Sequence, residues 1–524
     1  MTRNELEDLI RKTLEEFILT PNGSFRVGAP PAGVRADYMT SAALIFAKQA
    51  GKTPRVLAEE LAAAFRRTSA CADIEIGVEG PGYINFILNE TALLRLFERF
   101  ARRRGKNFDF RLGQKIHIEF ISANPTGDLH IGHGRGAFYG DILARVLEAA
   151  GASVTREYYI NDSRESVQIR ELGKTALGKG KQYKTTKLEA LIGETDFSGM
   201  SEADAGFALA RKIEKANEYF IEKKLGIRID RWYSEDGNIR VQQLAEKIIG
   251  ELRVQGMVIE EEGALWLDTS RGGDDEKRVI VRSDGSNSYF ISDIAYHADK
   301  FSRGFDSVID VWGADHHGHV KRMMAVKNML GWEGDFRIFI TQLVSLKENG
   351  TSKKMSKRAG TIILLEDLVD ELGIDVVRWF FAEKAISTHM DFDLALAREQ
   401  SAKNPVYYAQ YAHARAHSII KKTEGENMDG RGVIESIKEP AGRALVVKIL
   451  RFSEVVKDIS EDYQVHKLTT YSYELASAFS QFYRDVRIHD RGKVNSGALE
   501  LVKVAKQTIS EALALMGVSA PAEM

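Results

Sequence analysis

The sequence predicts an α/β fold built around a parallel sheet, with a small α+β domain before it and an all-α helical bundle after it. Three patterns support this prediction. Strand-like and helix-like segments mix within 1–110, a strand–helix–strand order follows over 115–160, and helical periodicity prevails from about 390 onwards. The chain has 524 residues, enough for roughly two to four domains of ordinary size. We expect three domains, over 1–110, 111–385 and 386–524.

The first domain, 1–110, begins with a segment of helical period. Apolar side chains recur every three or four residues over 4–20, the spacing of one helix face. Two more helical patterns follow over 40–67, and 74–88 alternates like two strands around a Gly-Pro-Gly turn. We therefore expect a small α+β domain.

The middle domain, 111–385, begins with the clearest pattern in the chain. An apolar strand at 116–121 is followed by a turn at 122–127, a helix over 135–150 and a second strand over 154–160. This is the order of a βαβ unit, whose two strands run parallel.

Residues from about 165 to 280 break that rhythm with a polar, lysine- and glycine-rich stretch and then helical patterns. This range predicts an insertion into the sheet. Strands resume at 308–312 and 336–346, and almost everything after 386 is helical in period. The last part of the chain therefore predicts a helical bundle.

Composition excludes some kinds of site. There are 73 basic and 75 acidic residues, so net charge alone does not indicate nucleic acid, although a local basic patch is compatible with RNA. Cys71 is the only cysteine, which excludes a disulfide within the chain and a cysteine-based zinc cluster. The N-terminus has no apolar signal core, and no run of 18 or more apolar residues occurs. We expect a cytoplasmic protein that does not enter a membrane.

The most informative short motif is His130-Ile131-Gly132-His133, which opens the helix of the βαβ unit. Unpaired N–H groups and a partial positive charge at a helix N-terminus favour phosphate. Small residues at Gly132, Gly134 and Gly136 would let ATP approach the main chain, and we expect Gly127, Gly132 and Gly134 to bind it. His130 and His133 lie near one face of the first turn and could donate to phosphate as charge develops, so we expect both to be catalytic. The alternative is a glycine-rich turn with two satisfied histidines, which an isolated motif would favour.

A second motif, Lys354-Met355-Ser356-Lys357, lies in a loop rich in lysine, serine and glycine. Lysines on such a loop can close over a triphosphate and neutralise the leaving pyrophosphate. We expect Lys354 and Lys357 to be catalytic, and Met355 and Ser356 to contact ATP with them. Alone, this run would predict only a solvated basic turn. Its pairing with the first motif favours a nucleotide site.

The stretch His316-His317-Gly318-His319 could suggest a metal site. No carboxylate stands beside it at a known ligand spacing, so we expect no metal held by the protein. A Mg²⁺ ion carried by ATP is expected instead, because it bridges phosphates and needs few protein ligands.

Together the two motifs resemble the signatures of the class I aminoacyl-tRNA synthetases, and longer stretches resemble the arginyl-tRNA synthetases. The resemblance runs from Asp37-Tyr38 to the closing 520–524 and is weakest over 170–215. The stretches that carry it are Ile121-Ser122-Ala123-Asn124-Pro125-Thr126-Gly127, Glu157-Tyr158-Tyr159-Ile160-Asn161-Asp162, Ser288-Tyr289-Phe290-Ile291-Ser292-Asp293-Ile294-Ala295-Tyr296-His297, Val311-Trp312-Gly313-Ala314-Asp315-His316-His317 and Asn404-Pro405-Val406-Tyr407-Tyr408-Ala409-Gln410-Tyr411.

The resemblance implies a Rossmann-type catalytic domain that attaches arginine to tRNA(Arg), with ATP, through an arginyl-adenylate. In such a site Tyr289 would line the guanidinium pocket and Asp293 would pair with the guanidinium nitrogens. Asn124 and Glu235 would hold the other end of the substrate, Glu235 attracting either the α-ammonium or the guanidinium. A planar, permanently charged guanidinium needs carboxylates and a flat partner, which agrees with these residue types. The implied arginine-binding residues are Ser122, Asn124, Glu235, Tyr289, Asp293 and His317.

The resemblance also implies two tRNA-binding regions. The first domain would be an additional tRNA-binding domain in which Tyr83 stacks on an unpaired base and Asn85 hydrogen-bonds its edge. The C-terminal bundle would bind the anticodon, and Tyr408 and Tyr411 offer aromatic faces for it. No coiled-coil pattern is evident, so we expect a monomer.

Two other functions are compatible with these motifs. A class I synthetase for another amino acid, such as lysine, would also need a carboxylate in its pocket. A non-catalytic RNA-binding paralogue could keep the fold, but it would have no chemical reason to keep both motifs. A small-molecule adenylyltransferase is a more distant alternative, because it would not need the two terminal domains.

Overall fold

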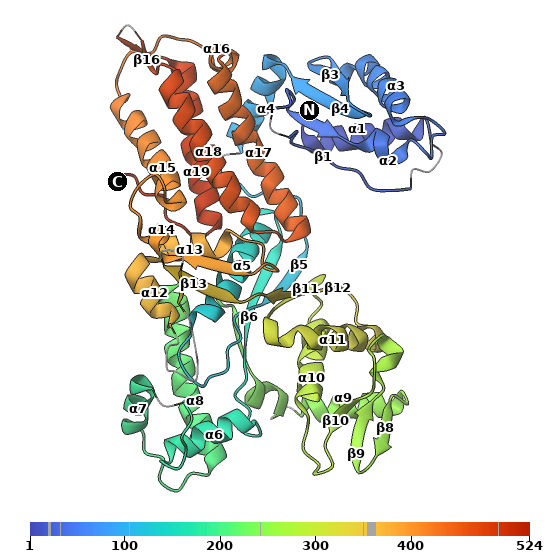
Figure 1. The fold of residues 1–524 in the computed structure, drawn as a ribbon, viewed down its shortest axis with the longest axis vertical. Helices are drawn as coiled ribbons and strands as arrows, with labels where there is room; N and C mark the ends of the chain where they lie inside the picture. Colours follow the sequence, from blue (N-terminus) through green and yellow to red (C-terminus); the bar gives the residue numbers. More distant parts are fainter. Residues whose placement is uncertain are drawn as a thin grey trace.

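The computed structural model describes residues 1–18, 22–31, 33–103, 105–183, 185–240, 243–348, 351–353, 363–490 and 492–524. Figure 1 shows the helical bundle, in orange and red, at one end of the long axis with the blue N-terminal domain beside it. The central sheet lies in the middle, and two smaller units extend at the other end. Within the part of the chain that the structure describes, no helix is both long and apolar enough to cross a membrane.

The N-terminal domain is a four-stranded antiparallel sheet, in the order β1-β2-β4-β3, packed against helices. Ile84, Phe86 and Leu88 alternate along β4 and are buried, which is the pattern of a strand with one face on a core. This is the α+β arrangement that the sequence predicts. Its elements are α1 (Arg3–Glu15), β1 (Val27–Gly28), β2 (Tyr38–Thr40), α2 (Ala42–Phe46), α3 (Pro54–Arg67), β3 (Ile74–Glu79), β4 (Tyr83–Leu88) and α4 (Glu90–Arg102).

The central sheet has five strands, all parallel, in the order β12-β11-β5-β6-β7. Alternate residues of β11 pack on opposite sides: Ile309 and Val311 join the hydrophobic cluster that contains α5, and Val308 joins the one that contains α10. Helices therefore cover both faces, as the predicted α/β fold requires. The elements are β5 (Lys115–Glu119), α5 (Ile131–Ala149), β6 (Ser153–Ile160), β7 (Arg231–Ser234), α10 (Tyr289–Ser302), β11 (Ser307–Gly313), α11 (His317–Leu330) and β12 (Asp335–Thr341).

The range predicted as one insertion, about 165–280, contains a strand of the main sheet. β7 pairs with β6 and divides the range into two units. It was missed because it has only four residues between polar segments, too few for a clear alternation. The first unit holds α6 (Val167–Ala176), α7 (Thr186–Gly193) and α8 (Glu202–Tyr219); the second holds α9 (Leu244–Val254) and the antiparallel strands β8 (Val258–Glu261), β9 (Ala264–Leu267) and β10 (Arg278–Val281).

The unit of α6, α7 and α8 has a hydrophobic cluster of its own, separate from the cores that flank the sheet. Its helices α6 and α8 cross with their main chains in contact. A Cβ on Gly173 would lie 1.7 Å from the carbonyl oxygen of Glu202, and one on Gly206 would lie 1.9 Å from that of Ile169. Only glycine allows so close a crossing.

A small mixed sheet, β14-β13-β15, follows the main one. Because β15 runs parallel to β13, residues up to Asp393 belong to this sheet, so the bundle begins later than the predicted residue 386. The elements here are β13 (Val344–Glu348), β14 (Thr351–Lys353), α12 (Leu365–Leu372), α13 (Ile374–Ala382), β15 (Met390–Asp393) and α14 (Leu394–Arg398).

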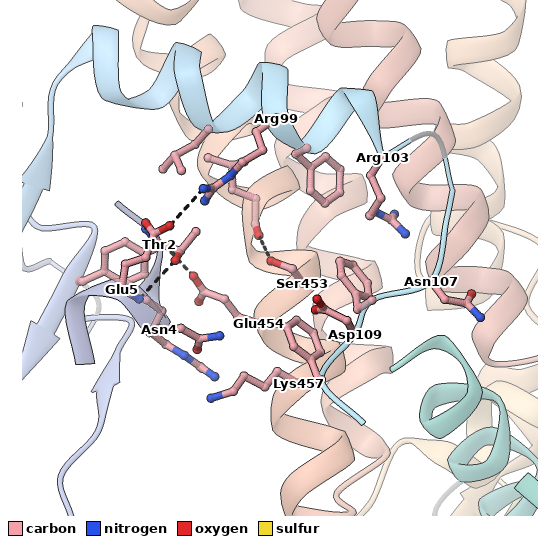
Figure 2. Close-up of a pocket in the computed structure, with 17 residues that line it drawn as sticks. Thr2, Asn4, Glu5, Arg99, Arg103, Asn107, Asp109, Ser453, Glu454 and Lys457 are labelled. Atoms are coloured by element: carbon pink, nitrogen blue, oxygen red, sulfur yellow. Dashed lines mark hydrogen bonds and ion pairs between the residues drawn. The ribbon is translucent and has the colours of Figure 1, made fainter. Parts of the chain in front are cut away.

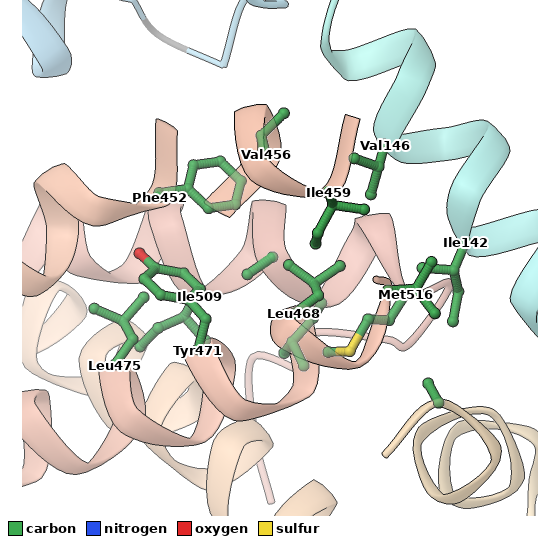
Figure 3. Packing of buried hydrophobic residues seen from close by; sticks show 14 of the residues in the cluster. Ile142, Val146, Phe452, Val456, Ile459, Leu468, Tyr471, Leu475, Ile509 and Met516 are labelled. Carbon is green, nitrogen blue, oxygen red and sulfur yellow. The ribbon is translucent and has the colours of Figure 1, made fainter. Parts of the chain in front are cut away.

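The C-terminal bundle packs directly on α5. Figure 3 shows Ile142 and Val146 of α5 beside Ile459, Leu468 and Met516 of the bundle, all in one hydrophobic cluster. The helix that opens with the first motif is therefore also part of the bundle's core. The bundle consists of α15 (Pro405–Lys422), α16 (Val433–Lys438), α17 (Pro440–Asp462), α18 (His466–Asp485) and α19 (Ser496–Leu515), with a short hairpin of β16 (His489–Asp490) and β17 (Lys493–Val494).

A cavity of about 670 Å³ lies where α1 and α4 of the N-terminal domain face α17 of the bundle (Figure 2). Polar contacts join the two sides. Arg3 holds the carboxylate of Asp458 with hydrogen bonds of 2.6 and 2.9 Å, and the Tyr38 hydroxyl donates to Glu454 over 2.6 Å. The N-terminal domain is thus fixed to the bundle by charged and polar groups as well as by its apolar core.

Candidate active site

The strand order places a crevice at the carboxyl ends of β5 and β11. The chain leaves β5 towards β6 on one side and leaves β11 towards β12 on the other, so the connections diverge between these neighbours. Such a divergence is where open α/β sheets bind their ligands. A cleft of about 410 Å³ lies there, lined by Glu119, Ile121, Ser122, Ala123, Asn124, Gly132, His133, Gly136, Tyr159, Asn161, Gln168, Asp293, Tyr296, His297, Val311, Trp312, Gly313, Asp315, His316, His319 and Thr341.

The turn after β5 is held in a strained conformation. Ile121 and Ser122 have φ angles of 73° and 41°, in the left-handed region that side chains other than glycine rarely adopt. The Ser122 hydroxyl donates to Glu119 over 2.7 Å and accepts from the main-chain N–H of Tyr159 over 3.1 Å. Strain of this kind persists where surrounding contacts impose it, commonly at functional sites. Ser122 is thereby fixed at the cleft, as predicted for a binding residue.

His130 and His133 cap α5 by accepting hydrogen bonds from its first turn. Nδ1 of His130 accepts from the N–H of Gly132, and Nδ1 of His133 accepts from the N–H of His130, each over 3.1 Å. The two rings stack with centroids 3.8 Å apart. Since Nδ1 is an acceptor in both, a neutral ring carries its hydrogen on Nε2, which is then the atom that can donate to a phosphate.

The glycines of the first motif serve different purposes. Gly132 borders the cleft, and a Cβ there would lie 2.9 Å from the ring of His130. Gly134 instead faces the interior, where a Cβ would lie 2.9 Å from Leu365. Gly127 does not line the cleft, and its carbonyl accepts from Asn217 of α8 over 3.3 Å. Of the glycines expected near ATP, the structure thus places Gly132 and Gly136 at the cleft, but not Gly127 or Gly134.

The second motif, with Lys354, Met355, Ser356 and Lys357, lies outside the described residues. The chain on its far side is described, and it lies against the first motif. The N–H of Ile131 donates to the carbonyl of Ile363 over 3.2 Å, and the N–H of Leu365 donates to that of Leu129 over 2.9 Å. His130 and Leu364 form a β-bridge between these bonds. Ile363, the first described residue after this motif, therefore lies directly beside the first motif.

Asp293 projects from α10 into the cleft and contacts a histidine. One of its carboxylate oxygens lies 2.9 Å from Nε2 of His319, and the two side chains are 34% and 17% exposed. The His319 ring packs beside Trp312 and Phe290, with centroids 5.5 and 5.8 Å away. Tyr289, one helical turn before Asp293, is 48% exposed and lies outside the cleft lining.

Glu235 begins a short π-helical segment directly after β7 and is only 6% exposed. Burial, reinforced by the nearby Asp293 carboxylate, raises the pKa of Glu235 to about 8, although the hydroxyls of Tyr159 and Ser292 donate to it. A carboxyl group with this pKa is poised to ionise when a cation binds beside it. The structure thus brings Glu235 and Asp293 into one electrostatic environment.

Two further predicted residues differ in placement. Asn124 lines the cleft, and its side-chain oxygen accepts from Asn161 over 3.1 Å. His317 is exposed and does not line the cleft, whereas His316 and His319 do. Tyr159 and His319 were not predicted as site residues. Tyr159 stands in one of the stretches that carry the resemblance, and His319 in the histidine-rich run considered for a metal, but the fold brings both to the cleft.

Three family models match the chain. The one described as "tRNA synthetases class I (R), catalytic domain" matches residues 101–170 and 206–422, more than half of the chain. "Arginyl tRNA synthetase N terminal domain" matches 4–88, and "DALR anticodon binding domain" matches 409–524.

The chain belongs to the arginyl-tRNA synthetase family.

Curated relatives in the arginyl-tRNA synthetase family match from end to end. The arginine–tRNA ligase of Bacillus velezensis is 38% identical over 560 residues, with 99% of each chain covered. That of Bacillus subtilis is 38% identical over 525 residues, covering 94% of this chain and 93% of the relative. The solved arginyl-tRNA synthetase of Thermus thermophilus shares the fold over 100% of both chains, with a TM-score of 0.78 and 23% identity.

The residues expected to meet tRNA in an arginyl-tRNA synthetase are placed differently from one another. On β4, Tyr83 is half-buried and Asn85 only 4% exposed, with no partner for Asn85 Oδ1 among the described side chains. On α15, Tyr408 packs on Tyr473 with ring centroids 5.1 Å apart. Tyr411 is 47% exposed, and Arg415 lies over its ring at 4.9 Å.

Proposed function

We propose that this cleft activates arginine with ATP and transfers it to tRNA(Arg). The chain is an arginine–tRNA ligase of class I. The arginine carboxylate attacks the α-phosphate, giving arginyl-adenylate and pyrophosphate. The terminal ribose hydroxyl of tRNA then attacks the adenylate carbonyl, giving arginyl-tRNA and AMP. Neither step needs a protein nucleophile, so catalysis consists of positioning and electrostatic stabilisation.

The observation that carries the proposal is the geometry at the start of α5. His130 and His133 stack there, each ring anchored through Nδ1, so that Nε2 can donate to the α-phosphate as negative charge builds on it. The bond between Ile131 and Ile363 ties the chain six residues after Lys357 to the same turn. We assign Lys354 and Lys357 to the leaving pyrophosphate, because lysine side chains near this turn would neutralise its charge.

For arginine we assign the guanidinium to Asp293 and the α-ammonium end to the region of Asn124 and Ser122. Burial and the nearby Asp293 carboxylate raise the pKa of Glu235 to about 8, so a cation bound beside them favours the ionised form of Glu235. Tyr289, which begins α10 and is exposed, is assigned to the rim of the guanidinium pocket. His317, which is exposed, takes no direct part in this assignment.

For tRNA we assign Tyr83 and Asn85 to the N-terminal contact and Tyr411 to the anticodon contact. The unpartnered Oδ1 of Asn85 is an acceptor that a base N–H could satisfy. Arg415 lies between the rings of Tyr411 and Tyr483, 4.9 and 5.0 Å from their centroids, and both tyrosines are well exposed. Exposed aromatic rings with a cation between them suit unstacked RNA bases. We expect Tyr408 to contribute less to the tRNA contact than Tyr411, because the Tyr408 ring packs within the bundle.

The remaining assignments concern the chain as a whole. We propose that residues 1–110 act as a tRNA-binding domain, that the catalytic domain runs from 111 through β15, and that the helical bundle after β15 binds the anticodon. The protein is proposed to be a cytoplasmic monomer. Mg²⁺ enters with ATP as part of the substrate; among the described residues, no group of three or more His, Cys, Asp or Glu is arranged to hold a metal.

The experiment that tests this function is charging of total tRNA with each labelled amino acid in turn. We expect only arginine to be attached. ATP–pyrophosphate exchange should depend on arginine, and this exchange is measured both with and without tRNA. Charging with lysine instead would keep the class I chemistry and overturn the pocket assignment. Binding of tRNA without any charging would identify a non-catalytic paralogue.

A further inference from the structure

A network of buried charges lies at the wall of the cleft, where two of its members, Glu119 and His297, belong to the lining. Lys300 is 0% exposed and lies 2.8 Å from Asp310 Oδ1, and its ammonium also contacts Glu119. The second oxygen of Asp310 lies 2.7 Å from Nε2 of His297. Nδ1 of the same ring lies 2.7 Å from the main-chain carbonyl oxygen of Asp293. His297 therefore bridges β11, through Asp310, and the turn of α10 that carries Asp293.

The partners of His297 decide which hydrogens its ring carries. A main-chain carbonyl can only accept, so Nδ1 must donate to Asp293. The carboxylate of Asp310 is ionised, so it too can only accept, and Nε2 of His297 donates to it. Burial alone would raise its pKa, but Lys300 and His297 hold the pKa of Asp310 well below its usual value. Both partners of the ring therefore favour a hydrogen on each of its nitrogens.

We propose that His297 is a positioning residue for arginine: as an imidazolium held by Asp310, it fixes the main chain of Asp293 and so the carboxylate that receives the guanidinium. This inference rests on the proposed function. His297 would not contact the substrate itself, but would hold Asp293, which does.

The surroundings of the ring leave it little freedom. The rings of Phe336 and Trp312 pack on it with centroids 5.5 and 6.1 Å away, and its side chain is 3% exposed. The charges balance within the network, because Lys300 and His297 offset Asp310 and Glu119. A cation can therefore lie beneath a pocket for a cationic substrate without repelling it at close range.

The chain offers a matched control in His117 of β5. It is 0% exposed and lies 3.3 Å from the buried carboxylate of Glu157, yet it has no contact with Asp293. Burial lowers the pKa of His117, so this ring is neutral. Replacing either histidine disturbs a buried histidine–carboxylate pair of the same sheet, but only His297 connects such a pair to the cleft.

The test compares His297→Gln with His117→Gln in full-length protein. We expect His297→Gln to raise the arginine KM about tenfold while the ATP KM stays near the wild-type value, since small misplacements at a site are costly. His117→Gln should leave both KM values near wild type, even where it lowers thermal stability. Equal arginine KM values in the two variants would overturn the proposal.

A second measurement does not depend on the folding of a histidine variant. Solvated histidines are mostly neutral at neutral pH, so selective ¹⁵N labelling of the 12 histidines should show one ring with hydrogen on both nitrogens. Asp310→Asn should remove that signature. A wild-type spectrum without such a ring would also overturn the proposal. Loss of arginine charging by the wild-type protein would instead contradict the proposed function.

Discussion

Arg443 of α17 holds both carboxylate oxygens of Asp37, with hydrogen bonds of 3.0 Å to Oδ1 and 2.7 Å to Oδ2. Asp37 is 7% exposed and precedes β2, and its Oδ2 also accepts from the N–H of Leu88 on β4. One ion pair therefore joins the N-terminal sheet to the longest helix of the bundle.

Removing the cation of this pair should weaken the joint. Arg443→Met leaves Asp37 buried without its partner, so we expect the free energy of unfolding to fall by about 2 kcal/mol. Urea denaturation followed by circular dichroism measures this. Arg484→Met is the control, because Arg484 is 72% exposed beside Asp485 and should change stability by less than about 0.5 kcal/mol. Equal effects of the two substitutions would contradict a structural role for the Arg443–Asp37 pair.

His133→Ala should slow the activation step. The loss of one donor to the developing phosphate charge should lower kcat for ATP–pyrophosphate exchange by about 10²-fold. Arginine KM should change little, because the ring does not contact the assigned guanidinium site. Unchanged turnover would remove His133 from the catalytic residues, and would leave it only its capping role in α5.

Asp293→Asn should affect arginine before it affects ATP. A charged hydrogen-bond partner of a guanidinium is worth about 1.5–3 kcal/mol, so we expect the arginine KM to rise at least about tenfold. Asp299→Asn, on the same helix but outside the cleft and beside Arg303, serves as the control. A wild-type arginine KM in the Asp293 variant would refute the pocket assignment.

Two glycines of α5 should respond oppositely to the same substitution. A Cβ on Gly140 would lie 2.3 Å from the ring of Phe120 and 2.7 Å from its Cβ, so Gly140→Ala should destabilise the protein by about 1–3 kcal/mol. At Gly136 the nearest atom is 3.5 Å away. Gly136→Ala should therefore be neutral or stabilising by up to about 1 kcal/mol, as alanine favours helix. Thermal unfolding distinguishes the two, and a stable Gly140→Ala protein would show that Phe120 can move.

Glu214 of α8 should make stability fall as the pH rises from 4.5 to about 8. Its side chain is 3% exposed, with no hydrogen-bond partner among the described residues, and burial raises its pKa from 4.5 to about 8. The folded state then keeps a proton that the unfolded state loses, so stability is lost as pH rises from 4.5 to 8, by at most about 1.4 kcal/mol per pH unit.

Glu214→Gln should remove that contribution. The variant should be more stable than wild type at alkaline pH, and the difference should shrink on acidification towards the lower end of this window. Denaturation curves collected across that range measure it. A constant difference at every pH would show that Glu214 does not titrate there.

Local patterns in the sequence were sufficient for the architecture. The strand before His130 and the helix after it follow from apolar spacing, and α5 begins at Ile131, just ahead of the predicted helix at 135–150. β7 escaped prediction because a four-residue strand gains its order from its neighbour β6 rather than from its own pattern. The joint of β15 to β13 is likewise a tertiary pairing.

The site residues show the same distinction between local sequence pattern and tertiary packing. Ser122, Asn124, Gly132, His133 and Asp293 belong to motifs, and the structure gathers them at one cleft. The orientation of a side chain within a motif is decided by packing. For this reason Gly134 faces Leu365, although it stands in a motif that looks functional. His319 and Tyr159 reach the cleft only through the fold, which sequence spacing does not encode.

The crossing of α6 and α8 has a consequence for local unfolding. Because the unit of α6, α7 and α8 has its own hydrophobic cluster, its free energy of local unfolding is smaller than that of the whole chain. Its amide hydrogens should therefore exchange as one cooperative group, ahead of those in the central strands. The ammonium of Lys187 on α7 lies 2.8 Å from Asp128, just before the first motif. Local unfolding of the unit would therefore break a contact beside that motif.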